Sequence, residues 1–108
     1  GGGPLSEKTT VLVLSEMGRT PVLNGAVGKD HWPYTSAMLT GAGVRSGVYG
    51  ATNEALVGQP VDPDSGQAAG SGVELTAAGF LGGILAAFDV DPMAAFPDAT
   101  PFTAPLRG

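Results

Sequence analysis

An unbroken apolar run, Val-Leu-Val-Leu at residues 11–14, constrains the fold of this chain more than any other stretch. A strand with one exposed face alternates apolar and polar residues, so this run predicts a strand over residues 9–15 that is buried on both faces. Strands of that kind belong to parallel sheets covered by helices. Ser15, Glu16 and Arg19 follow directly, at the carboxyl end of the strand, where open parallel sheets bind their ligands.

The glycine and proline content predicts long loops and few regular elements. The 18 Gly and 9 Pro make up a quarter of the 108 residues, which approaches the range of about 25–30% where low-complexity chains begin. Charged residues account for only 14%, against roughly a quarter in typical soluble domains. We therefore expect one modest domain in which irregular backbone dominates.

The charge balance and the lack of long apolar segments argue against two classes of partner. The net charge is −5 and there is no basic run, which disfavours nucleic acid. No apolar run reaches the roughly 18 residues of a membrane span. The absence of cysteine excludes disulfides and thiolate metal sites but leaves the redox compartment undecided. The Gly-rich start resembles neither a signal peptide nor an initiator region, so we expect a chain that begins within a longer protein.

Turn-forming residues divide the N-terminal half into short segments. Residues 1–8 are predicted to be a flexible lead-in before the strand at 9–15. Residues 16–33 lack an apolar repeat and are expected to form a long loop, and loops of this length are usually functional or disordered. A second short strand is expected at residues 36–40, followed by a hairpin-like return at 44–50.

The C-terminal half is expected to contain one helix. Residues 51–72 are rich in turn formers and predict a surface excursion. The helix begins near Glu74 or Thr76, with Thr76 as a suitable N-cap, and residues 89–92 end it. Residues 93–108 are expected to be an irregular Pro-rich tail with a short edge strand near 102–104. The apolar stripe predicted to lie on a sheet consists of Phe80, Leu81, Ile84, Leu85 and Phe88.

Candidate chemistry is concentrated in the loop at residues 16–33. Glu16, Asp30 and His31 are of types that ligate divalent metals, with carboxylate and imidazole together suiting zinc, manganese or iron. The alternative for His31 is a hydrogen bond to loop backbone. Arg19 is suited to bind phosphate or sulfate through its planar fork, and its alternative role is a salt bridge to Glu16 or Asp30 that orders the loop.

A set of short motifs carries a family resemblance. Together they resemble the C-terminal part of the domain of unknown function family fifteen hundred and one, bacterial exported proteins related to sulfatases and alkaline phosphatases, over residues 9–92. The motifs lie at residues 15–21, 24–25, 28–33, 41–47 and 50–52.

The resemblance implies an α/β fold, the C-terminal portion of an alkaline-phosphatase-like α/β/α sandwich. It implies a metal-dependent hydrolase of phosphate or sulfate esters, periplasmic or on the cell surface, once an N-terminal half is present. Glu16 and His31, with Asp30 nearby, would then hold a divalent ion (zinc, manganese, calcium or magnesium). There the metal activates a nucleophile and neutralises the transferred group, and Arg19 is the predicted catalytic anion contact.

Two other functions remain open from the sequence. The first is a non-catalytic surface or assembly protein that keeps the fold without the site, with a large apolar interface. The second is an acidic binding module that folds by itself. The expected partners are the N-terminal remainder of the same protein, or another chain that completes the sheet, and further copies of the chain. The expected organisation is a lead-in at 1–8, a sulfatase-like part at 9–92 and a tail at 93–108.

Overall fold

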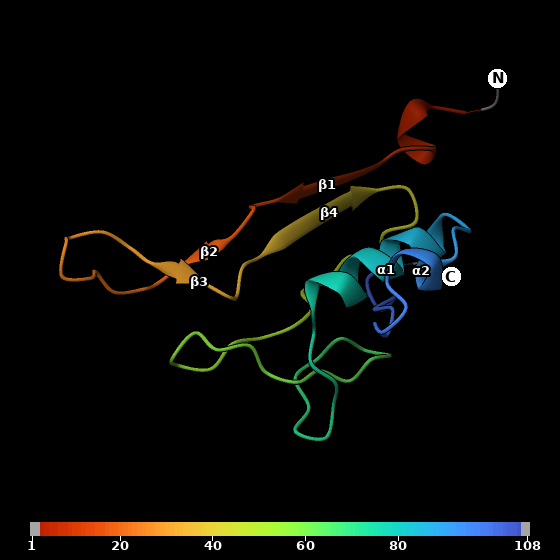
Figure 1. Cartoon of the computed structure of the whole chain (residues 1–108). Helices are drawn as coiled ribbons and strands as arrows, with labels where there is room; N and C mark the ends of the chain where they lie inside the picture. Colours follow the sequence, from red (N-terminus) through yellow and green to blue (C-terminus); the bar gives the residue numbers. More distant parts are fainter. Residues whose placement is uncertain (1–2, 107–108) are drawn as a thin grey trace.

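A long antiparallel hairpin, residues 10–41, dominates the N-terminal part of the protein and is called the hairpin arm below (Figure 1). In this computed structural model, which describes residues 3–106, β1 (Thr10–Leu14) pairs with β4 (Ala37–Gly41). Further along the arm, β2 (Gly18–Arg19) pairs with β3 (His31–Trp32). The outer ends of the predicted lead-in (residues 1–2) and tail (107–108) lie outside the described residues.

The predicted buried parallel strand is wrong in two respects. β1 is antiparallel to its neighbour, and within residues 3–106 its sheet consists of β1 and β4. Its side chains are also far from buried, since Val11, Val13 and Leu14 are 46%, 52% and 55% exposed. A two-stranded ribbon with no layer packed over it cannot cover both of its faces, so three of the four apolar residues are exposed and Leu12 is half-buried. The predicted loop at residues 16–33 likewise contains β2 and β3.

Three helical segments accompany the arm. A 3-10 turn, η1 (Leu5–Glu7), lies in the predicted lead-in. The predicted helix is confirmed as α1 (Ala77–Ala87), and its N-cap is Thr76, whose Oγ1 accepts from the Gly79 N–H at 3.0 Å. A short second helix, α2 (Pro92–Ala95), follows and was not predicted.

The buried face of α1 is made of glycine. Gly79, Gly82 and Gly83 are its buried residues, and the extended segment 100–104 crosses directly over them. There the Phe102 N–H donates to the Gly79 carbonyl oxygen at 2.8 Å. The predicted apolar stripe is only partly buried. Phe80 packs against the core, and Ile84 and Leu85 are half-buried, whereas Leu81 and Phe88 are 36% and 56% exposed. Glycine allows two backbones to approach closely, so these positions let the segment 100–104 lie directly against the helix backbone.

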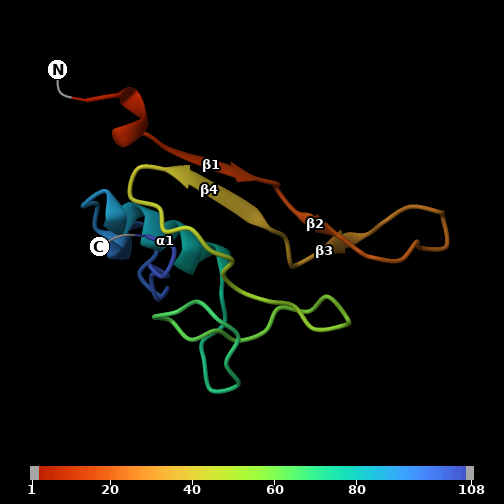
Figure 2. The same ribbon diagram turned by 180° about the vertical axis from the view of Figure 1, so that it is seen from behind.

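The core is small and comes from the C-terminal half. Val61 is fully buried, and it packs with Phe102 and Ala104. The predicted surface excursion at residues 51–72 is thus wrong at its centre, because backbone bridges from Val61 to Ala68 and Val73 fold this loop inward. The segment 102–104 is part of the core rather than an edge strand. Figure 2 shows these loops below the hairpin arm, with β1 on the side away from the helices.

The protein is more extended than a globular domain of its size. Its Cα radius of gyration is 15.8 Å, against about 13 Å expected for this length. Its accessible surface is 7333 Å² for 10.7 kDa, whereas a folded monomer of that mass exposes about 5,500 Å². The fold is thus a mixed one, with two small antiparallel sheets, helices and few regular elements.

Candidate functional site

The hairpin arm changes register at its middle. In the inner ribbon Leu14 pairs with Ala37, and in the outer ribbon Gly18 pairs with Trp32. Three residues (15–17) therefore lie opposite four (33–36), so the returning strand carries one extra residue, as in a β-bulge. Such an insertion bends a ribbon and re-aims the side chains beyond it. The predicted site residues all lie at this bend or beyond it.

The outer ribbon brings Arg19 and His31 together. They are direct cross-strand partners, so their side chains leave the ribbon on the same face. The Thr20 N–H donates to the Asp30 carbonyl at 3.0 Å and extends the ladder by one pair. The Arg19 guanidinium donates through Nη1 to the Lys29 carbonyl at 3.3 Å. Arg19 therefore orders the loop through a backbone acceptor rather than through the predicted salt bridge.

Asp30 and Glu16 occupy different surroundings. Asp30 precedes His31 in the chain and so points to the opposite face of the ribbon, where its Oδ1 accepts from Asn24 Nδ2 at 2.9 Å. Glu16 lies in the bend between β1 and β2, with the Ser15 hydroxyl 3.4 Å from its Oε2. Glu16 is thus outside the paired residues of the outer ribbon that carry Arg19 and His31. Within residues 3–106, no three carboxylate or imidazole side chains gather closely enough to form a metal site.

Trp32 attaches the arm to the rest of the protein, a role that the sequence pattern does not specify. Its indole Nε1 donates to the Leu56 carbonyl at 3.0 Å, across 24 residues of chain. Its ring meets that of Tyr34 edge-on, with centroids 6.2 Å apart. Tyr34 in turn lies against Gly58, where a β-carbon would come within 2.6 Å of its ring. These contacts join the outer ribbon to the loop at residues 53–58.

One face of the β1–β4 ribbon is an uncovered apolar surface. Cross-strand pairing places Val13 beside Met38 and Val11 beside Thr40, and these four residues are called the outer face. Val11, Val13 and Met38 are 46%, 52% and 57% exposed. The opposite face carries the Leu12–Leu39 pair, which is half-buried.

The free edge of β1 adds a second interaction element to the outer face. The sheet order is β1–β4, so the outer backbone N–H and C=O groups of β1 have no strand partner among residues 3–106. Edge strands that avoid pairing usually carry a lysine, a proline or a bulge. The sequence of β1, Thr-Val-Leu-Val-Leu, contains none of these. The edge is therefore competent to accept a further strand.

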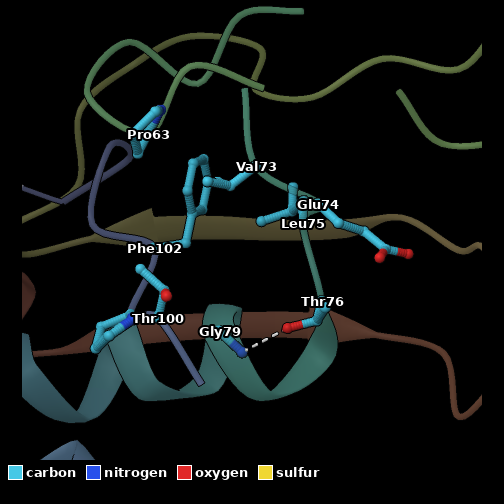
Figure 3. A pocket seen from close by; sticks show the side chains of 9 residues that line it. Pro63, Val73, Glu74, Leu75, Thr76, Gly79, Thr100 and Phe102 are labelled. Carbon is cyan, nitrogen blue, oxygen red and sulfur yellow. Dashed lines mark hydrogen bonds between the residues drawn. The ribbon is translucent and has the colours of Figure 1, made fainter. Parts of the chain in front are cut away.

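Two hollows lie outside the arm's tip. The larger, about 260 Å³, is a groove between the start of β1 and the C-terminal part of α1. The smaller, about 10 Å³, lies at the N-terminus of α1 (Figure 3) and has room for about one water molecule. Its upper side is lined by Val73, Leu75 and Phe102. Its lower side is lined by Thr76 and Gly79, which are joined by the N-cap hydrogen bond. Neither hollow contains Glu16, Arg19, Asp30 or His31.

Comparison with known proteins places the chain in a family without an assigned function. A family model described as "Protein of unknown function (DUF1501)" matches residues 3–65, more than half of the chain. This finding corrects the recognition of a sulfatase-related family over residues 9–92, because the match has other bounds and its description names no activity. No curated protein and no solved structure matches the chain. None of the helices within residues 3–106 has the length and apolarity needed to cross a membrane.

Proposed function

The chain belongs to the DUF1501 family of proteins of unknown function, and on that premise we propose that it serves as an assembly segment. In this proposal, polypeptide beyond these 108 residues adds a strand to the free edge of β1 and covers the outer face. The completed sheet, with helices on both sides, would form a layer of an α/β/α sandwich. The function is to hold parts of a larger protein together through the arm.

The main support for this proposal is the solvent exposure of the apolar side chains in the outer face. Fully burying a Val or Met side chain contributes about 1.5–3 kcal/mol, and Val11, Val13 and Met38 leave roughly half of that gain unused. The accessible surface also exceeds that of a compact monomer by about 1,800 Å². A standard interface buries only about 800 Å² per partner. This excess belongs to the extended shape of the whole chain, of which the outer face is one part, and it is larger than the area that one partner buries in a standard interface.

The occupant is proposed to be a β-strand because of the backbone groups that it would satisfy. An added strand pairs its own N–H and C=O groups with those at the edge of β1, and its alternate side chains extend the apolar face. A helix could cover the outer face but would leave this edge unpaired. Strand addition uses both features of the surface at once.

Thiol labelling of the intact native protein tests the proposal. The chain has no cysteine, so Val13→Cys introduces a single thiol in the outer face. Val48→Cys is the matched control, since Val48 is 83% exposed and lies outside the arm. We expect Val13→Cys to be protected in the intact protein and reactive in the isolated chain, while Val48→Cys reacts in both. Equal reactivity of the two thiols in the intact protein would rule the proposal out.

Metal-dependent hydrolysis of phosphate or sulfate esters is the second candidate. It is favoured by the pairing of Arg19 with His31, which places a guanidinium and an imidazole on one face of the outer ribbon. Further metal ligands would come from the covering polypeptide. The test is elemental analysis of the intact protein with and without His31→Ala. Bound metal that is lost in the variant supports this function, and an unchanged metal content contradicts it.

A further inference from the structure

The hairpin arm ends in a five-residue turn built around one asparagine side chain. Asn24 Oδ1 accepts from the backbone N–H of Ala26 and of Gly28, both at 2.9 Å. The Asn24 N–H donates to the Gly28 carbonyl at 2.8 Å, and the Val27 N–H donates to the Asn24 carbonyl at 3.0 Å. Val27 has a positive φ of 60°. Gly25 supplies the one N–H between residues 24 and 28 for which the structure shows no acceptor.

A second turn in the same protein repeats this geometry. Asn53 Oδ1 accepts from Ala55 and Val57 at 2.9 and 3.1 Å. The Asn53 N–H donates to the Val57 carbonyl at 3.0 Å, and the Leu56 N–H donates to the Asn53 carbonyl at 2.9 Å. Leu56 has a φ of 59°. The position after the asparagine is glycine in the first turn and Glu54 in the second, and the fourth and fifth positions change from Val27 and Gly28 to Leu56 and Val57.

The first turn holds a nucleophile next to a polarised carbonyl. The Gly25 N–H has no acceptor in the structure. A bond from its nitrogen to the side-chain carbon Cγ of Asn24 would close a five-membered ring. The Ala26 and Gly28 N–H groups donate to Asn24 Oδ1. They are therefore placed to stabilise the negative charge that develops on this oxygen when Cγ is attacked, as in an oxyanion hole. No atom beyond the neighbouring residues lies within 4 Å of the position of a β-carbon on Gly25, so no other part of the protein crowds this residue.

We propose that Asn24 is a site of spontaneous backbone-assisted deamidation. The Gly25 nitrogen forms a bond to Cγ, the bond from Cγ to Nδ2 breaks, and the Gly25 proton leaves with the departing ammonia. The resulting succinimide is opened by one water molecule, which gives aspartate or isoaspartate at position 24. No oxidant or reductant takes part. The net change is the gain of water and the loss of ammonia.

The product alters the tip of the arm. Asn24 Nδ2 donates to Asp30 Oδ1 at 2.9 Å in the unmodified protein. After deamidation that donor is replaced by a carboxylate, so two anions face each other at the end of the ribbon that carries Arg19 and His31. Like charges at such close range repel each other. The modification thus loosens the turn and makes the protein more negative by one charge.

Peptide mapping by mass spectrometry after incubation of the folded chain in mildly alkaline buffer tests the proposal, and Asn53 serves as an internal control. We expect Asn24 to convert at least about tenfold faster than Asn53, a difference of about 1.4 kcal/mol in activation free energy. Gly25→Ala is expected to slow conversion at Asn24. Glu54→Gly is expected to start conversion at Asn53. Equal rates at the two asparagines, or an unchanged rate in Gly25→Ala, would overturn the proposal.

Discussion

The carbonyl oxygen of Tyr34 occupies the space that a β-carbon on Gly18 would need. The contact lies at the bend of the hairpin arm, where the extra residue of the returning strand pushes the backbone of Tyr34 toward β2. Glycine at position 18 is therefore a packing requirement, because any side chain there would separate the two strands.

Gly18→Ala is expected to destabilise the protein by about 1–3 kcal/mol, the usual cost of overpacking. Hydrogen exchange should rise first at the outer ribbon, β2 and β3. Gly70→Ala is the control, since a β-carbon at Gly70 meets no atom within 4 Å. Urea denaturation of the two variants measures the difference, and equal stabilities would show that the strands separate freely at the bend.

Gly83→Ala is expected to destabilise the protein even though alanine favours helix. A β-carbon at position 83 would collide with the Phe102 carbonyl oxygen, and the resulting overpacking of about 1–3 kcal/mol exceeds the helix-propensity gain of about 1 kcal/mol. Gly82→Ala is the matched variant, because its β-carbon would meet Pro92 at an ordinary 3.5 Å. We expect that substitution to be neutral or stabilising. Thermal unfolding followed by circular dichroism distinguishes the two, and opposite signs are the decisive result.

Trp32→Phe is expected to cost about 1 kcal/mol, since it keeps a ring but removes the indole donor to the Leu56 carbonyl. Tyr34→Phe keeps the edge-on ring contact with Trp32 and should leave stability unchanged. Urea titration followed by circular dichroism compares the variants. A Trp32→Phe protein as stable as the parent would show that the hydrogen bond contributes nothing to anchoring the arm.

Asp62 is expected to contribute stability that is lost in acid. The backbone N–H groups of Ser65 and Asp64 donate to its carboxylate and hold the pKa of Asp62 below its ordinary value of 3.8. A group whose pKa is lowered by folding stabilises the native state above its unfolded pKa. That contribution disappears as the pH falls through the lower, folded value.

Asp62→Asn tests this pH dependence, because the amide oxygen can still accept both hydrogen bonds but does not titrate. Urea midpoints measured across the acid range should fall less steeply in this variant than in the parent. Asp98→Asn removes a carboxylate elsewhere and should retain the parent's slope. Parallel curves for the parent and Asp62→Asn would contradict the expectation.

Local sequence signals predicted local structure well in this protein. The Thr76 cap specified the start of α1 because a threonine hydroxyl satisfies an otherwise unpaired N–H of the first turn. The short strand predicted at residues 36–40 appears as β4, one residue later. The cap depends on residues three positions apart, and β4, although it pairs with the distant β1, was visible as a short apolar run between turn formers.

Predictions that depended on distant contacts failed. The run at residues 11–14 has the composition of a covered strand, yet cover would have to come from other polypeptide, which the run itself does not identify. The stripe predicted for α1 did not include Gly79, Gly82 and Gly83, yet these are the buried residues of the helix. Asp30 and His31 were grouped as neighbours in sequence, but alternation along a strand turns adjacent side chains to opposite faces.

The extra residue among positions 33–36 also sets which side of β4 meets which side of β1. Side chains alternate along a strand, so if the register of the outer ribbon continued past the bend with no extra residue on the returning strand, β4 would lie one position further along β1 and exchange its two sides. Leu39 would then turn outward beside Val11 and Val13, and Met38 would turn inward beside Leu12. The spacing of one short, irregular stretch thereby determines the orientation of every side chain on the strand that follows.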